Sequence, residues 1–181
     1  MEMNVDAVIV GAGPVGLLTA VELSLGGVRV LVLERLAAPS MATKALGIGS
    51  LGSEALQRRG MAAAVAAAEE RTFAAIKKVT DQNGPDVRGR GSKFGGHFAG
   101  LSLIRKDAQK EPERRVRLVD QHAVEAMLAD RARSLGIKVR RECEVRGFVQ
   151  DADGVDVGWA SATGENDTHC SFLVGCDGGR S

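Results

Sequence analysis

A glycine-rich motif near the start of the chain constrains its fold more than any other feature. An apolar run, Val8 to Val10, leads directly into Gly11-Ala12-Gly13-Pro14-Val15-Gly16. We interpret the run as a buried parallel strand. Gly11 would then turn the chain, Gly13 would let a pyrophosphate approach the backbone, and Gly16 would let the next helix pack closely on the strand. An anion is favoured there, because a helix N-terminus offers unpaired N–H groups and the positive end of its dipole. The motif therefore predicts a dinucleotide site.

The residues that follow the motif favour the same interpretation. Pro14 suits a first helical turn, where its missing N–H costs nothing. The apolar face of this helix is predicted to comprise Val15, Leu18, Leu23 and Leu25, with Gly26-Gly27 after its end. A second strand, Val28 to Leu33, ends at Glu34, whose carboxylate can accept hydrogen bonds from the ribose hydroxyls of an adenosine and would repel the 2′-phosphate of NADP. The alternative is a tight strand-turn-helix unit that binds no ligand.

The composition excludes several other classes of protein. The chain has 181 residues, of which 44% are hydrophobic and 26% charged, and its net charge is +1, which indicates a globular sequence of about one domain. A near-neutral charge and an aromatic content of 3% argue against a nucleic-acid surface. The three cysteines lack a Cys-x-x-Cys spacing and the three histidines are widely separated, so we expect reduced core thiols and no metal site. No leader or membrane span is predicted, and a cytoplasmic protein is expected.

The middle of the chain is predicted to mix helices with a small separate sheet. A helix over Ser50 to Arg59 ends at Gly60, and the alanine-rich segment from Met61 to Glu70 also favours a helix. Two short apolar segments, Phe73 to Val79 and Phe98 to Ile104, are interpreted as strands joined by glycine-rich and polar loops.

The last third is predicted to consist of one helix followed by strands. Val124, Met127, Leu128 and Leu135 have helical spacing, and Gly136 ends that helix. The strands that follow are predicted at Ile137 to Arg141, Cys143 to Gln150, Val155 to Ala160 and Thr168 to Val174, the last three forming a meander. A second glycine-rich turn comes after the final strand with nothing left to cover the sheet, so we expect the N-terminal part of a longer protein.

Taken together, three motifs resemble those of the single-component FAD-dependent aromatic hydroxylases, the para-hydroxybenzoate hydroxylase-like monooxygenases. They are the glycine motif at Gly11 to Gly16, the pair Glu34-Arg35, and the ending Cys176-Asp177-Gly178-Gly179-Arg180-Ser181. The segment Gly95 to Leu101 and the same ending are most similar to the branch that hydroxylates aromatic polyketides. The resemblance covers the whole chain, and the two glycine turns about 160 residues apart are its most specific part.

The resemblance implies a set of FAD-binding residues. Gly11, Gly13 and Gly16 would hold the pyrophosphate, Glu34 the ribose, and Arg35 would lie beside the adenine. Lys44 stands where the family usually has an arginine that contacts the flavin phosphates, and Gln121 and Asp177 match residues near the flavin. The complete predicted cofactor set is Gly11, Ala12, Gly13, Pro14, Val15, Gly16, Glu34, Arg35, Lys44, Gln121, Asp177 and Gly178. No catalytic residue is predicted within the chain, and substrate contacts are implied around Gly47 to Gly49 and His97 to Leu101.

The resemblance also implies a fold and a reaction. The fold is an α/β, Rossmann-like FAD-binding domain of the glutathione-reductase type, with a β-meander and the start of a small β-sheet substrate domain. The FAD-binding parts would span residues 1–72 and 106–181, separated by a β insertion at 73–105. FAD reduced by NADPH (or NADH) would react with oxygen to a flavin C4a-hydroperoxide, which hydroxylates a small aromatic, polyketide-like or phenolic substrate. The alternatives are a truncated, non-catalytic FAD-binding module and another FAD oxidoreductase of the superfamily, such as an epoxidase, reductase or halogenase.

Overall fold

A computed structural model describes residues 5–40, 45–83, 94–98, 101–105 and 115–179 of the chain. The chain divides into two compact units. The first comprises Met1–Ala42 with Glu125–Ser181, and the second comprises Thr43–Val124. The predicted boundaries at residues 72/73 and 105/106, which separate cofactor from substrate parts, stay a prediction. Across the described residues, no helix combines the length and the apolar character needed to cross a membrane.

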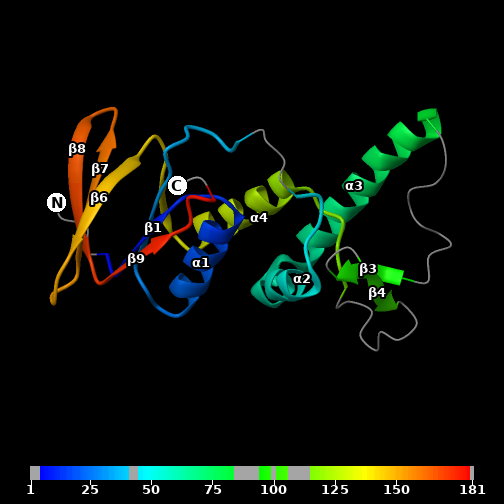
Figure 1. Cartoon of the computed structure of the whole chain (residues 1–181), viewed down its shortest axis with the longest axis horizontal. Coiled ribbons are helices and arrows are strands. Elements are labelled where there is room, and N and C mark those ends of the chain that lie inside the picture. Colours follow the sequence, from blue (N-terminus) through cyan, green and yellow to red (C-terminus); the bar gives the residue numbers. More distant parts are fainter. Residues whose placement is uncertain (1–4, 41–44, 84–93, 99–100, 106–114, 180–181) are drawn as a thin grey trace. The chain divides into compact units, whose positions relative to one another are not determined.

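A four-stranded parallel sheet forms the centre of the first unit (Figure 1). Its order is β5 (Lys138–Arg140), β2 (Val30–Leu33), β1 (Ala7–Val10) and β9 (Phe172–Gly175). Strands β1 and β2 are joined by helix α1 (Pro14–Leu25), which packs against both. Most residues of β1 and all four of β2 are buried, which explains why they read as continuous apolar runs without alternation. The predicted mixed α/β fold with a parallel sheet is confirmed.

Helix α1 buries a different face from the one predicted. Its buried residues are Gly16, Leu17, Ala20 and Val21, whereas Val15 and Leu25 are exposed. Apolar residues occupy most positions of this helix, so the hydrophobic pattern does not single out one face. Gly16 belongs to the buried face, because the Gly11 carbonyl and Cys176 leave no room there for a larger side chain.

The start of β1 is fixed by a charged pair at the opposite end from the glycine motif. Asp6 Oδ2 accepts hydrogen bonds from the backbone N–H and from Nε of Arg29, each at 2.8 Å. These bonds lower the pKa of Asp6 to about 2. The backbone carbonyl of Asp6 also accepts the N–H groups of Ser171 and Phe172, at 3.0 and 3.1 Å.

An antiparallel meander makes the second sheet of this unit. It consists of β6 (Glu144–Gln150), β7 (Val155–Ser161) and β8 (Gly164–Cys170). On its exposed face, His169 Nδ1 lies 2.8 Å from Asp156 Oδ1, and this hydrogen bond raises the pKa of His169.

The predicted single strand from Thr168 to Val174 is wrong. It is broken at Ser171 into β8, which belongs to the meander, and β9, which belongs to the parallel sheet. The hydrogen bonds from Ser171 and Phe172 to the Asp6 carbonyl hold the chain where it changes sheets. Strand-forming residues continue through the break, so the local sequence does not mark it.

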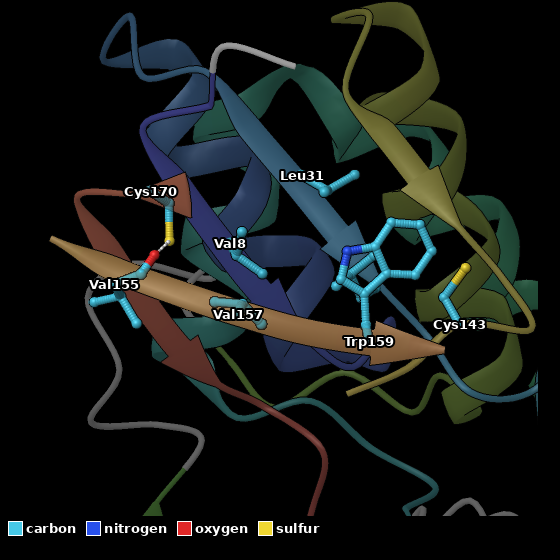
Figure 2. Packing of buried hydrophobic residues seen from close by; sticks show 8 residues of the cluster. Val8, Leu31, Cys143, Val155, Val157, Trp159 and Cys170 are labelled. Carbon is cyan, nitrogen blue, oxygen red and sulfur yellow. Dashed lines mark hydrogen bonds between the residues drawn. The ribbon is translucent and has the colours of Figure 1, made fainter. Parts of the chain in front are cut away.

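One hydrophobic core cluster of the first unit lies between the two sheets (Figure 2). Val8 and Leu31 of the parallel sheet face Val157 and Trp159 of β7, all of them buried. The indole Nε1 of Trp159 donates to Thr168 Oγ1 at 3.0 Å, which satisfies its polar group inside the core. The two free thiols of this cluster are Cys143 and Cys170, and burial raises the pKa of both.

The second unit is mostly helical. Helix α2 (Ser50–Leu56) is followed by the segment η1 (Gln57–Met61), where the backbone leaves the helical conformation, and then by α3 (Ala62–Asn83). The kink between them lies at Gly60, whose φ of 81° is readily adopted by glycine. A short antiparallel pair, β3 (Phe94–Phe98) and β4 (Leu101–Arg105), completes the unit.

The predicted strand from Phe73 to Val79 is wrong, because this segment belongs to α3. Phe73 and Ile76 are half-buried, whereas Ala74 and Ala75 between them are exposed. That spacing of three residues is helical, and the segment continues the buried stripe of Val65 and Ala68. Within the second predicted strand, Phe98 to Ile104, Phe98 ends β3 and Leu101 to Ile104 belong to β4, whereas Ala99 and Gly100 lie outside the described residues.

A buried ion cluster holds the second unit together. The carboxylate of Glu69 on α3 accepts two hydrogen bonds from Arg115, both at 2.7 Å, and one from Arg117 at 2.9 Å. Burial alone raises the pKa of Glu69, but the two guanidinium groups outweigh it and the net shift is downward. Arg117 in turn forms a backbone bridge with Ile48, so the cluster fixes that segment to α3.

Helix α4 (Gln121–Ser134) carries the chain from the second unit back into the first. The carboxylate of Asp120 caps its start, because Asp120 Oδ1 accepts the N–H of Ala123 at 3.0 Å. The helix is followed by Gly136, with a φ of 72°. Its predicted existence, apolar spacing and C-terminal glycine are therefore confirmed.

Candidate functional site

The glycine turn lies at the carboxyl end of β1, next to the end of β2. The N–H of Gly11 donates to the carbonyl of Leu33 at 2.7 Å, which continues the pairing of the two strands into the turn. Gly11 has a φ of 104°, and a Cβ on it would lie 2.5 Å from the carbonyl oxygen of Cys176. Both the backbone conformation and the space therefore require glycine here.

Gly16 is required by close packing inside the first glycine-rich turn and against the second. A Cβ on Gly16 would lie 2.0 Å from the carbonyl oxygen of Gly11 and 3.2 Å from Cys176 Cβ. The N–H of Cys176 donates to the carbonyl of Val10 at 2.7 Å, which holds the second turn against the first. The structure thus brings together two motifs that stand at opposite ends of the sequence.

Gly13 faces open space. It is the N-cap of α1, with φ −75° and ψ −179°, and a Cβ there would meet none of the described atoms within 4 Å. No side chain in the described part of the chain caps the helix at this point, so its first-turn N–H groups point outward without an intrahelical acceptor. A negatively charged group could approach this backbone closely, and the N-terminal end of α1 would favour it.

Glu34 lies beside this opening and is held by its own backbone. Its N–H donates to the carbonyl of Arg140 at 2.8 Å, and its carbonyl accepts the N–H of Cys143 at 2.9 Å. Its side chain turns toward the glycine motif, where Oε2 accepts the N–H of Ala12 at 2.7 Å. Oε1 accepts the N–H of Leu36 at 2.9 Å. The backbone partners Arg140 and Cys143 were not predicted, and no local sequence signal marks them.

The other predicted residues lie at the end of the parallel sheet, in the second glycine-rich turn, or elsewhere in the chain. Arg35, Pro14 and Val15 belong to the same end of the parallel sheet, with Arg35 and Val15 exposed. Asp177 is exposed, and its Cα would lie 3.0 Å from a Cβ on Gly11, so the acid follows directly on the contact between the turns.

Gly178 comes next in the second turn, with a φ of 98°. Gln121 belongs to the second unit, where its N–H donates to the carbonyl of Ala45 at 3.2 Å. Lys44 lies outside the described residues, as do Ala99 and Gly100 of the implied substrate segment.

Cys176 is the one cysteine that touches this site. Its thiol is free and half-buried, and burial raises its pKa, so the neutral thiol is favoured at neutral pH. The local role of Cys176 is to pack against Gly16 rather than to supply a charge.

This geometry defines a dinucleotide-binding protein of the Rossmann-like class: a βαβ unit, an open glycine turn at a helix N-terminus, and an acid at the end of the second strand. Residues 4–181 match the family described as FAD binding domain, and the chain belongs to that family.

Similar proteins agree with this assignment. The chain is 38% identical over 180 residues to the 12-dehydrotetracycline 5-monooxygenase/anhydrotetracycline 6-monooxygenase of Streptomyces rimosus subsp. rimosus, covering 99% of this chain and 32% of that protein. Among solved structures, the anhydrotetracycline hydroxylase from Streptomyces rimosus superposes with a TM-score of 0.76 at 36% identity, over 98% of this chain and 32% of the other.

A complex of aklavinone-11 hydroxylase with FAD and aklavinone gives a TM-score of 0.69 at 27% identity, over 100% of this chain and 34% of that one. The chain thus spans about a third of the length of the relatives it matches.

Proposed function

We propose that this chain is the FAD-binding part of an NADPH-dependent monooxygenase that hydroxylates an aromatic, polyketide-like substrate. The observation that carries the proposal is the contact between the two glycine-rich turns, which leaves Gly13 open beside Glu34. Support for the substrate class comes from the relatives, whose names specify the oxygenation of anhydrotetracycline. NADH is the alternative electron donor.

The residues of the first unit suit the adenosine diphosphate half of FAD. The first-turn N–H groups of α1, from Val15 onward, would bind the pyrophosphate. It could approach closely, because none of the described atoms lies within 4 Å of a Cβ placed on Gly13. Glu34 would accept the ribose hydroxyls with the lone pairs that its two backbone donors leave free. Arg35 would lie beside the adenine.

The flavin half would be held by the second glycine-rich turn. Asp177 and Gly178 follow the contact with Gly11 and would lie at the flavin side of the pyrophosphate. Lys44 and Gln121 would complete the cofactor set, the lysine supplying a positive charge to a phosphate without the bidentate geometry of an arginine.

The bound flavin would supply the redox chemistry, taking electrons from the nicotinamide and using oxygen to hydroxylate the ring. The residues of this chain would bind and orient that cofactor. We assign no acid, base or nucleophile to them. The segment Gly47 to Gly49 is proposed to contribute to the substrate site.

The experiment uses the protein purified at its full natural length. We expect a yellow protein whose flavin is released by heat and identified as FAD, and NADPH oxidation that forms a hydroxylated product from anhydrotetracycline or a similar polycyclic phenol. Bound FAD with NADPH oxidation but without hydroxylation of any phenolic substrate would favour another FAD oxidoreductase. Bound FAD with neither activity would favour the non-catalytic module, and a protein that binds no FAD would refute the proposal.

A further inference from the structure

Glu34 makes more contacts than the binding of a ribose requires. Before any ligand is considered, its two carboxylate oxygens accept the N–H groups of Ala12 and Leu36, at 2.7 and 2.9 Å. Ala12 is buried and stands inside the glycine motif, between the tightly packed Gly11 and the open Gly13. The carboxylate therefore joins the end of β2 directly to the turn that follows β1.

Backbone hydrogen bonds fix the position of Glu34. The carbonyl of Arg140 accepts the Glu34 N–H, and the N–H of Cys143 donates to the Glu34 carbonyl. Only two residues separate Arg140 from Cys143, and the chain turns there. Glu142 in that turn has a φ of 57°, the left-handed conformation that residues other than glycine seldom adopt. It is the only such non-glycine residue in the described part of the chain. Unusual backbone geometry persists where surrounding contacts demand it, and here the turn delivers the Cys143 N–H to Glu34.

We infer that Glu34 is a positioning residue for the glycine turn, in addition to its proposed contact with ribose. By accepting the Ala12 N–H it would fix the turn in the shape that keeps Gly13 open. This inference rests on the proposed function, because the shape matters only if a pyrophosphate binds there. Its consequence is that loss of the carboxylate weakens pyrophosphate binding even when the ligand has no ribose hydroxyls.

The first test needs no ligand. Glu34→Gln keeps the size of the side chain but offers one oxygen and one NH₂ group, so it can accept only one of the two backbone N–H groups well. Charged acceptors form the stronger hydrogen bonds, and we expect amide exchange at Ala12, at Leu36 or at both to accelerate on the order of tenfold. Glu165→Gln is the matched control, since Glu165 is exposed on β8 and the change removes the same charge. Unchanged exchange at both amides would overturn the inference.

The second test separates positioning from ribose binding. Affinities of the wild type and of Glu34→Gln are measured by calorimetry for ADP and for 2′,3′-dideoxy-ADP, which keeps the pyrophosphate but has no ribose hydroxyls. If Glu34 positions the turn, the substitution weakens dideoxy-ADP as well, on the order of tenfold. If Glu34 only accepts ribose, the substitution affects ADP alone, and the inference is wrong.

The two tests also separate this inference from the proposed function. A wild-type protein that binds neither ADP nor FAD would refute the proposed function, whatever Glu34 does in the turn. In that case faster amide exchange in Glu34→Gln would still show that the carboxylate holds the turn. The urea midpoint of each variant, followed by Trp159 fluorescence, shows whether an effect is local to the turn or reflects general unfolding.

Discussion

Replacing Gly16 by alanine tests the close packing of the start of α1 on the first glycine-rich turn. The new Cβ would lie 2.0 Å from the Gly11 carbonyl oxygen, whereas real Cβ atoms essentially never approach a neighbour closer than 3.0 Å. The turn would therefore have to move by about 1 Å, against the Gly11 and Ala12 hydrogen bonds that fix it to β2.

The magnitude follows from the balance of three effects. Overpacking costs about 1 to 3 kcal/mol, and loss of the Ala12–Glu34 hydrogen bond adds about 1.5 to 3 kcal/mol. The better helix propensity of alanine returns about 1 kcal/mol. We expect Gly16→Ala to lower the free energy of unfolding by about 3 kcal/mol, which corresponds to a Tm lower by roughly 10 °C for a chain of this size.

Gly13→Ala is the matched control within the same turn. The backbone angles at Gly13 are open to alanine, and the added methyl group would meet none of the described atoms within 4 Å. A small loss at the helix N-cap offsets the entropy gained in the unfolded chain, so stability should change by less than about 0.5 kcal/mol. FAD binding, however, should weaken at least about tenfold, because the methyl group would fill the space where the pyrophosphate approaches.

Both variants can be measured with the same two assays. Trp159 is the only tryptophan and lies in the core between the two sheets, so its fluorescence reports the unfolding of the first unit. Flavin content and FAD affinity report binding. A Gly16→Ala protein as stable as the wild type would refute the close approach of Gly16 to the Gly11 carbonyl. A Gly13→Ala protein with unchanged FAD affinity would refute the placement of the pyrophosphate.

Three further predictions concern charged groups. The pKa of Asp6 is lowered to about 2 by Arg29, so the ionised Asp6 contributes fully to stability above the unfolded pKa near 3.8, and this contribution is lost as the pH falls toward 2. Asp6→Asn should lower the free energy of unfolding at pH 7 and weaken its decrease at acid pH, measured by urea unfolding at a series of pH values. Glu69→Gln should cost about 2 to 4 kcal/mol, measured by urea unfolding followed by circular dichroism, because it leaves a buried arginine without its carboxylate. The pKa of His169 is raised by Asp156, so its stabilisation is present below the unfolded pKa and is lost as the pH rises through the folded pKa; NMR titration should show Asp156→Asn returning this pKa toward 6.5. An unchanged acid limb, a stable Glu69→Gln protein or an unshifted His169 titration would contradict the respective prediction.

Local patterns sufficed where one element could be interpreted by itself. The strand before Gly11, the helix that begins at Pro14 and the helix before Gly136 were all predicted correctly, because caps, prolines and glycines mark their ends. The strand predicted from the short apolar segment Phe73 to Val79 is wrong, since these residues continue a long helix. Short apolar runs do not separate the two possibilities without knowledge of what covers them.

The sequence by itself determined the parallel βαβ unit and the position of Glu34, since these depend on residues close together in the chain. It also determined the family resemblance, because each of the motifs that carry it can be recognised locally. Only the tertiary structure decided what depends on distant partners. It placed Cys176 against Gly16, chose the buried face of α1, split the chain at Ser171 between two sheets, and turned the Glu34 carboxylate onto Ala12. The physical reason is that steric fit and hydrogen-bond partners are set by atoms brought together from remote segments, which no local pattern encodes.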